Sequence, residues 1–154
     1  LGKFGAGAVL AVGLIVSSGL VLHIVGYATE PSAMFEAFPE TLRTLGALSL
    51  LTVFYCAICL LWGALTPDAS GVIAAMYLGI LEFCCSFLPG YFRCVSMNYV
   101  ARQIAGYEPK GLLPETAPEI APVIGVSVIL GLTLFVVFFA CLAVRGSEYR
   151  FAKA

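Results

Sequence analysis

One acidic residue, Glu82, lies near the middle of the apolar stretch from Gly71 to Val100, and it constrains the fold of this chain most strongly. An ionised carboxylate is costly in hydrocarbon, so Glu82 must be protonated, paired with a donor, or facing a polar cavity. The nearest basic residue on the same stretch, Arg93, lies about three helical turns away, too far for a pair on one helix. We therefore expect the partner of Glu82 to come from another helix or another subunit.

The composition is that of a membrane protein, because 61% of the 154 residues are hydrophobic and only 11% are charged. Backbone amides in lipid must be satisfied within a helix or a closed barrel, and these uninterrupted runs lack the alternation of barrel strands. The sequence therefore predicts an all-α integral membrane protein with both termini on the same side. Its single domain, 1–154, is predicted to be an antiparallel bundle of four transmembrane helices, at 4–28, 44–65, 71–100 (kinked near Pro89) and 123–144.

The segments between these runs differ in character. Residues 66–71 predict a tight turn, whereas residues 29–43 mix aromatic and acidic side chains and suit a segment lying along the headgroups or docking on a neighbour. Residues 101–122 contain four prolines, which predicts an extended strap. Basic residues are in excess on the side of the termini, which favours that side as cytosol, matrix or stroma.

Glu82 admits two interpretations. It could carry protons along an ion path, which predicts a small ion-coupled transporter. It could instead be a structural carboxyl that is hydrogen-bonded by a neighbouring subunit or by hydroxyl groups of other helices, namely Ser49, Thr52, Ser127 or Thr133. A single carboxylate without companions for a proton relay favours the structural interpretation. Arg93 is expected at the membrane interface.

His23 is the only histidine of the chain, and glycines at positions 19 and 26 leave space beside it on a helix. Such a space suits a flat macrocycle, so His23 is the candidate axial ligand of a haem or chlorophyll. The alternative is an interhelical hydrogen bond, because glycines at helical spacing more often mark close helix contacts. The sequence requires no cofactor; bound lipid is expected, and a pigment, haem or quinone stays open.

Cys56 and Cys59 form a C-x-x-C motif, and Cys84 and Cys85 form a vicinal pair. With four predicted spans, the motif resembles the quinone-linked disulfide-bond B and vitamin K epoxide reductase families, which implies a thiol oxidoreductase using Cys56 and Cys59. Those families also need a second pair in a loop, and the loops here contain no Cys. Buried Cys otherwise behaves as a small hydrophobe. Serine, phosphate-loop and zinc patterns are missing, which predicts a protein that is not an enzyme and binds no metal.

Small residues at helical spacing are the remaining signal. Gly13 with Ser17, and Ser127 with Gly131, have small-x-x-x-small spacing and, with Gly19, predict close helix packing, inside the bundle or against a neighbour. We therefore predict a non-catalytic accessory subunit of a multi-subunit complex in a respiratory or photosynthetic membrane.

The expected partners are other transmembrane subunits and the bilayer. Nucleic acid is not expected, because the 8 basic residues form no cluster. The start at Leu1 instead of Met favours an organellar inner membrane, mitochondrial or plastid.

Overall fold

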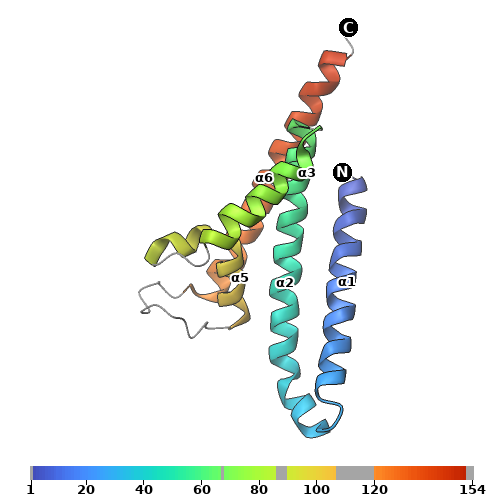
Figure 1. Ribbon diagram of the computed structural model, residues 1–154, viewed down its shortest axis with the longest axis vertical. Coiled ribbons are helices and arrows are strands. Elements are labelled where there is room, and N and C mark those ends of the chain that lie inside the picture. Colours follow the sequence, from blue (N-terminus) through green and yellow to red (C-terminus); the bar gives the residue numbers. More distant parts are fainter. Residues whose placement is uncertain (1, 67, 86–89, 107–119, 152–154) are drawn as a thin grey trace.

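The computed structural model describes residues 2–66, 68–85, 90–106 and 120–151, which are helical with short connections and contain no strand. Figure 1 shows an elongated molecule in which α1 begins and α6 ends toward the same, upper end of the view. In chain order the elements are α1 (Gly2–Gly26), α2 (Pro31–Leu65), α3 (Ser70–Met76), the π-helix η1 (Tyr77–Cys84), the 3₁₀-helix η2 (Gly90–Val95), α5 (Met97–Ala105) and α6 (Pro122–Phe151).

Three helices are long and apolar enough to cross a membrane, over Phe4–Gly26, Pro31–Leu65 and Pro122–Arg145. At 1.5 Å per residue, α1, α2 and α6 are about 37, 52 and 45 Å long, against a hydrocarbon core of about 30 Å. Most of their surface is apolar and exposed, and only 11% of the spanning window of α1 is buried within the chain. Lipid is the solvent that such a surface requires, so the protein is membrane-embedded.

The predicted continuous helix over 71–100 is replaced by four shorter elements. The apolar helical stretch Ser70–Glu82 is shorter than a span, and its second half is π-helical. Ser96 then has extended backbone angles, φ −79° and ψ 122°, and starts α5 as its N-cap. Pro89, where a kink was predicted, lies outside the described residues. A helix broken in this way has free backbone groups at each new end, and these need partners.

The segment 29–43, predicted to lie along the headgroups or to dock on a neighbour, is helical from Pro31 and continues directly into the second span. Proline is favoured in the first turn of a helix, because the missing N–H has no helical partner there. Pro39 lies further inside the helix without ending it. Of the strap predicted over 101–122, residues 101–105 belong to α5, residues 107–119 lie outside the described part, and α6 begins at Pro122.

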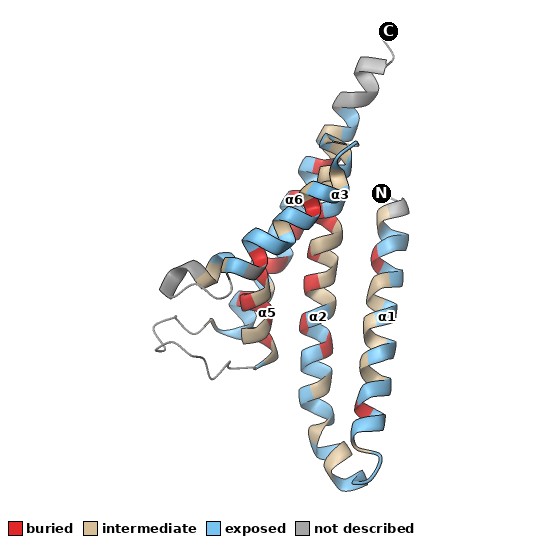
Figure 2. Cartoon of the chain, in the orientation of Figure 1, coloured by how far each residue is buried: buried red, intermediate tan, exposed pale blue. Residues whose placement is uncertain are grey.

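Helix α2 is the centre of the bundle and packs against α1, α5 and α6. Figure 2 shows buried residues concentrated where α2, α5 and α6 meet, whereas α1 is mostly exposed. Helix α5 is amphipathic, and its apolar face is buried in this core. Gly125 permits the close approach of α6 to α5, because a Cβ atom at position 125 would lie 2.9 Å from Ile104 Cγ1. The core consists mainly of Ala47, Leu51, Phe54, Ala57, Val100, Ile104, Ile129 and Val136.

Candidate functional site

Glu82 lies in a polar cluster inside the apolar bundle, and its side chain is 4% exposed. The Tyr77 hydroxyl donates to Oε1 over 3.1 Å, and the Ser96 hydroxyl donates to Oε2 over 2.9 Å. The backbone N–H of Asn98 donates to Oε2 over 3.0 Å, and the Tyr55 hydroxyl of α2 also hydrogen-bonds the carboxyl group. These five residues are the Glu82 centre. Its donors come from α2, η1 and α5, so the carboxyl group joins three elements.

Local backbone structure places these donors. A π-helix pairs residues five apart, which matches the spacing between Tyr77 and Glu82. Ser96 is the N-cap of α5, where its Oγ accepts the Tyr99 N–H over 3.3 Å and also lies 3.1 Å from the Glu82 carbonyl oxygen. Asn98 is the second residue of α5. The carboxyl group of Glu82 therefore lies at the positive end of a nine-residue helix, where negative charge is stabilised.

Among the described residues, the hydroxyls of Tyr77 and Ser96 can each donate to the Glu82 carboxyl oxygens, and the N–H of Asn98 can only donate. The centre therefore satisfies the carboxylate within this chain. Burying a charge is tolerable under these conditions, because the hydrogen bonds and the helix end replace the water that was lost.

The donors predicted for Glu82 are not the observed ones. Thr52, Ser127 and Thr133 donate instead to carbonyl groups of their own helices, over 2.8, 2.8 and 2.7 Å. A hydroxyl in a spanning helix has such a carbonyl four residues earlier, and this local bond needs no tertiary contact. Arg93, half-buried, lies in the last turn of η2, and its carbonyl oxygen accepts the Ser96 N–H over 3.0 Å.

His23 lies at the hairpin between α1 and α2 and is 7% exposed. Its Nε2 donates to the Met34 carbonyl oxygen, 3.2 Å away, and its Nδ1 lies 2.8 Å from the Thr41 hydroxyl. The rings of Tyr27 and Phe38 lie against it, with centroids 5.0 and 5.8 Å away. Both ring nitrogens therefore have protein partners, as the interhelical hydrogen bond requires.

The macrocycle ligand stays a prediction, because one of the two predicted spaces beside His23 is closed and the other is open: a Cβ atom on Gly26 would have no neighbour within 4 Å. Leu45 fills the space beside Gly19, so close that a Cβ atom on Gly19 would overlap its side chain. To bind iron or magnesium, His23 would also have to give up its contact with Met34 or with Thr41. Within the described residues, no three His, Cys, Asp or Glu side chains are grouped so that they could hold a metal ion.

Arg43 is a site residue that the sequence did not reveal. Its Nε donates to the Ile104 carbonyl oxygen in the last turn of α5, and its guanidinium lies beside Gly106, which ends α5 with φ +77°. Positive charge is stabilising at a helix C-terminus. Helix α5 therefore has an acidic side chain at its N-terminus and a basic one at its C-terminus, both supplied by other elements.

The chain matches no protein-family model, no curated protein and no solved structure. Its function is therefore inferred from the Glu82 centre, the His23 contacts and the outer faces of the helices.

The cysteines of the predicted motif lie on the spanning helix α2, where Cys56 is half-buried and Cys59 is exposed. Cys84 is exposed and donates to the Gly79 carbonyl oxygen over 3.7 Å, and Cys85 is half-buried. All four are free thiols. The thiol oxidoreductase hypothesis stays a prediction.

Among the small residues predicted to pack, Gly19 alone contacts another helix of this chain, through Leu45. A Cβ atom at Gly13 or Gly131 would have no neighbour within 4 Å. The Ser17 and Ser127 hydroxyls donate to carbonyl groups of their own helices over 3.2 and 2.8 Å, and both residues are exposed. These four positions therefore face away from the other described helices.

Proposed function

We propose that this chain is a non-catalytic accessory subunit of a larger membrane complex. In this proposal the bundle crosses the membrane four times with both termini on one side. The three long helices make three of the crossings, and α3, η1, η2 and α5 together make the other. This path is supported by Figure 1, in which the chain descends along α1, ascends along α2, descends through α3 to α5 and ascends along α6.

The observation that carries the proposal is the outward position of small residues on two spanning helices. Gly13 and Ser17 on α1, and Ser127 and Gly131 on α6, are exposed, and a Cβ atom at either glycine would have no neighbour within 4 Å. Glycine within a helix costs about 1 kcal/mol relative to alanine. Small residues at this spacing allow two helix backbones to approach closely in lipid, so these faces suit transmembrane helices of other subunits.

The polar centres support a structural role for the buried residues. The carboxyl group of Glu82 and the ring of His23 are both held by partners within the chain. Their hydrogen bonds join helices together, which is the contribution expected of a scaffold. The proposed setting is a respiratory or photosynthetic membrane, an organellar inner membrane of mitochondrion or plastid, with bilayer lipid as the second partner.

Purification from the native membrane in a mild detergent tests the proposal, and we expect other transmembrane subunits to co-purify. The double variant Gly13→Leu with Ser17→Leu should lose partners while its own unfolding midpoint is unchanged, because neither position packs within the chain. Gly7→Leu, exposed and likewise without a neighbour within 4 Å, is the matched control. A lone monodisperse monomer would count against the proposal.

The break before α5 favours a second candidate, an ion-coupled transporter that uses Glu82. Broken helices whose ends meet near the membrane centre form the ion and substrate sites of many transporters, and a buried acid at such an end suits proton coupling. Flux in proteoliposomes distinguishes the two. A transporter should show pH-dependent flux that Glu82→Gln abolishes, whereas an accessory subunit should show no flux in either form.

A further inference from the structure

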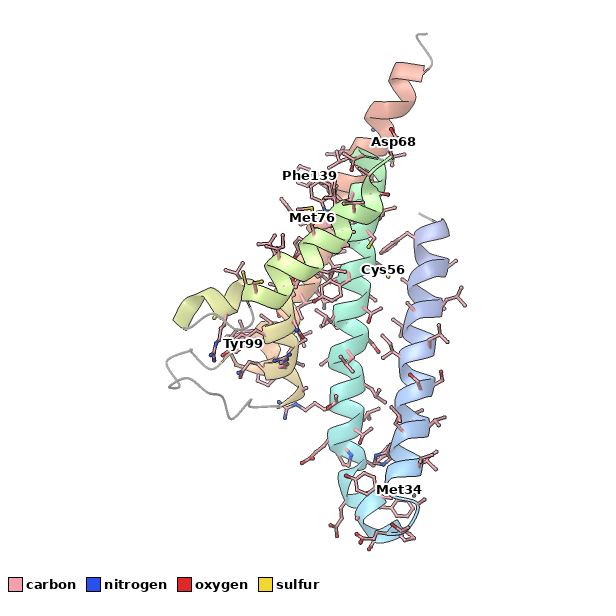
Figure 3. The ribbon with its side chains drawn as sticks, viewed as in Figure 1. Met34, Cys56, Asp68, Met76, Tyr99 and Phe139 are labelled. Carbon is pink, nitrogen blue, oxygen red and sulfur yellow. The ribbon has the colours of Figure 1, made fainter. Side chains whose placement is uncertain are left out.

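An open apolar groove of about 570 Å³ runs between the end of α2 and the second half of α6. Leu61 and Leu65 of α2 form one side, and Phe135, Phe139 and Leu142 of α6 are prominent on the other. The side chains of Leu65, Phe135 and Phe139 are 52%, 59% and 45% exposed, so the groove is open to its surroundings. Figure 3 labels Phe139 on α6.

The groove lies inside the spanning part of both helices, because the candidate spans extend to Leu65 on α2 and to Arg145 on α6. Its surroundings in a bilayer are therefore hydrocarbon. The lining offers an occupant apolar contact along its whole length, and its volume is within the range of ligand sites.

Charged residues of opposite sign follow the groove at its outer end. Arg145 comes three residues after Leu142 on α6, so the two side chains are neighbours on the helix surface. Asp68 comes three residues after Leu65, which lines the groove together with Leu142 of α6. Both residues are exposed. A molecule whose apolar chain lies in the groove would therefore have its polar end near the Arg145 guanidinium and the Asp68 carboxylate.

We propose that this groove binds one phospholipid with a zwitterionic, amine-bearing headgroup. An acyl chain lies along the apolar lining, the phosphate faces the Arg145 guanidinium, and the headgroup amine faces the Asp68 carboxylate. Guanidinium groups match phosphate oxygens in charge and geometry, and long basic side chains reach the headgroup level from the end of a span. A headgroup with net negative charge would lose the second contact and face Asp68 unfavourably.

The single tryptophan, Trp62, directly follows Leu61, which lines the groove, and serves as the reporter. The full chain in detergent is titrated with brominated phosphatidylethanolamine or brominated phosphatidylglycerol, and the quenching of Trp62 fluorescence is followed. We expect half-maximal quenching at a several-fold lower concentration of the phosphatidylethanolamine. Native mass spectrometry of the same sample should count one retained phospholipid.

Two variants and a control decide the assignment. Ala143→Phe fills the groove and should abolish the preferential quenching, and Arg145→Gln should reduce the preference several-fold without touching the lining. Leu134→Phe places the same aromatic side chain at a 71% exposed position outside the groove and should behave as wild type. If Ala143→Phe misfolds, the loss of lipid preference in Arg145→Gln still tests the proposal.

Equal quenching by both lipids, or preferential quenching that survives Ala143→Phe, would overturn the proposal. The proposal would also fail if Ala143→Phe released a partner protein from the native assembly and released no phospholipid. That result would assign the groove to a helix of a neighbouring subunit. The lipid titration needs no partner subunit, so its outcome is independent of the accessory function.

Discussion

The hydroxyl of Ser96 donates to Oε2 of Glu82 over 2.9 Å, although the two residues lie 14 positions apart in the chain. The contact holds the N-terminus of α5 against the π-helical element that precedes it. At the other end of α5, the Arg43 guanidinium binds the Ile104 carbonyl group. A nine-residue helix is marginal by itself, so we expect α5 to depend on these two contacts and on its buried face.

Replacing Ser96 with alanine should destabilise the protein by about 1–3 kcal/mol. The change removes both the cap of the Tyr99 N–H and a donor to a buried carboxylate. The unfolding midpoint in a mild detergent, followed by circular dichroism as SDS is added, measures this loss. Ser127→Ala is the matched control, since its exposed hydroxyl bonds only its own helix, and its midpoint should change little. Equal midpoints for the two variants would contradict the role of Ser96.

Glu82→Gln should also destabilise the fold, by about 1.5–3 kcal/mol, because charge-assisted hydrogen bonds become neutral ones. The amide nitrogen of glutamine also cannot accept the hydrogen bonds that one of the two carboxyl oxygens accepts. The exposed carboxyl of Glu36 provides the control substitution Glu36→Gln. An unchanged SDS unfolding midpoint for Glu82→Gln would show that the carboxylate is not required for the fold.

Gly19→Leu should separate α1 from α2, because a side chain at this position overlaps the buried Leu45. Overpacking of this kind typically costs about 1–3 kcal/mol. Spin labels on the two helices would report the separation as an increased distance. Gly131→Leu, with no neighbour within 4 Å, should leave the isolated chain unchanged. Identical distances in the Gly19 variant and wild type would remove the proposed close contact.

Gly106→Ala should cost about 1 kcal/mol or more, since φ +77° is strained for a residue with a side chain. The added Cβ atom would also lie 2.9 Å from a terminal nitrogen of Arg43. Hydrogen exchange of the last amides of α5 should accelerate. Gly63→Ala, in an open part of α2, should instead be neutral or slightly stabilising. Unchanged exchange in α5 would argue against this C-terminal cap.

The membrane class of this protein follows from the sequence by itself. Long apolar runs determine the solvent, because the transfer of about 20 apolar side chains outweighs any local preference, and three of the predicted spans are present as long helices. The N-cap at Ser96 also had a local signal, since a serine directly before an amphipathic stretch favours a helix start. Hydropathy placed residues 71–100 in one helix, because it measures solvent preference and does not register a change from α- to π-helix.

The partners of Glu82 and of Arg43 were decided only by tertiary structure. Ser96 and Asn98 reach Glu82 because the start of α5 packs beside η1, and Arg43 reaches a carbonyl group 61 residues away because α5 packs on α2. A buried charge takes whichever donors or acceptors the packed helices bring within about 3 Å, and apolar side chains determine that packing. Residue types along the chain show that such a charge needs partners, and the packing selects them.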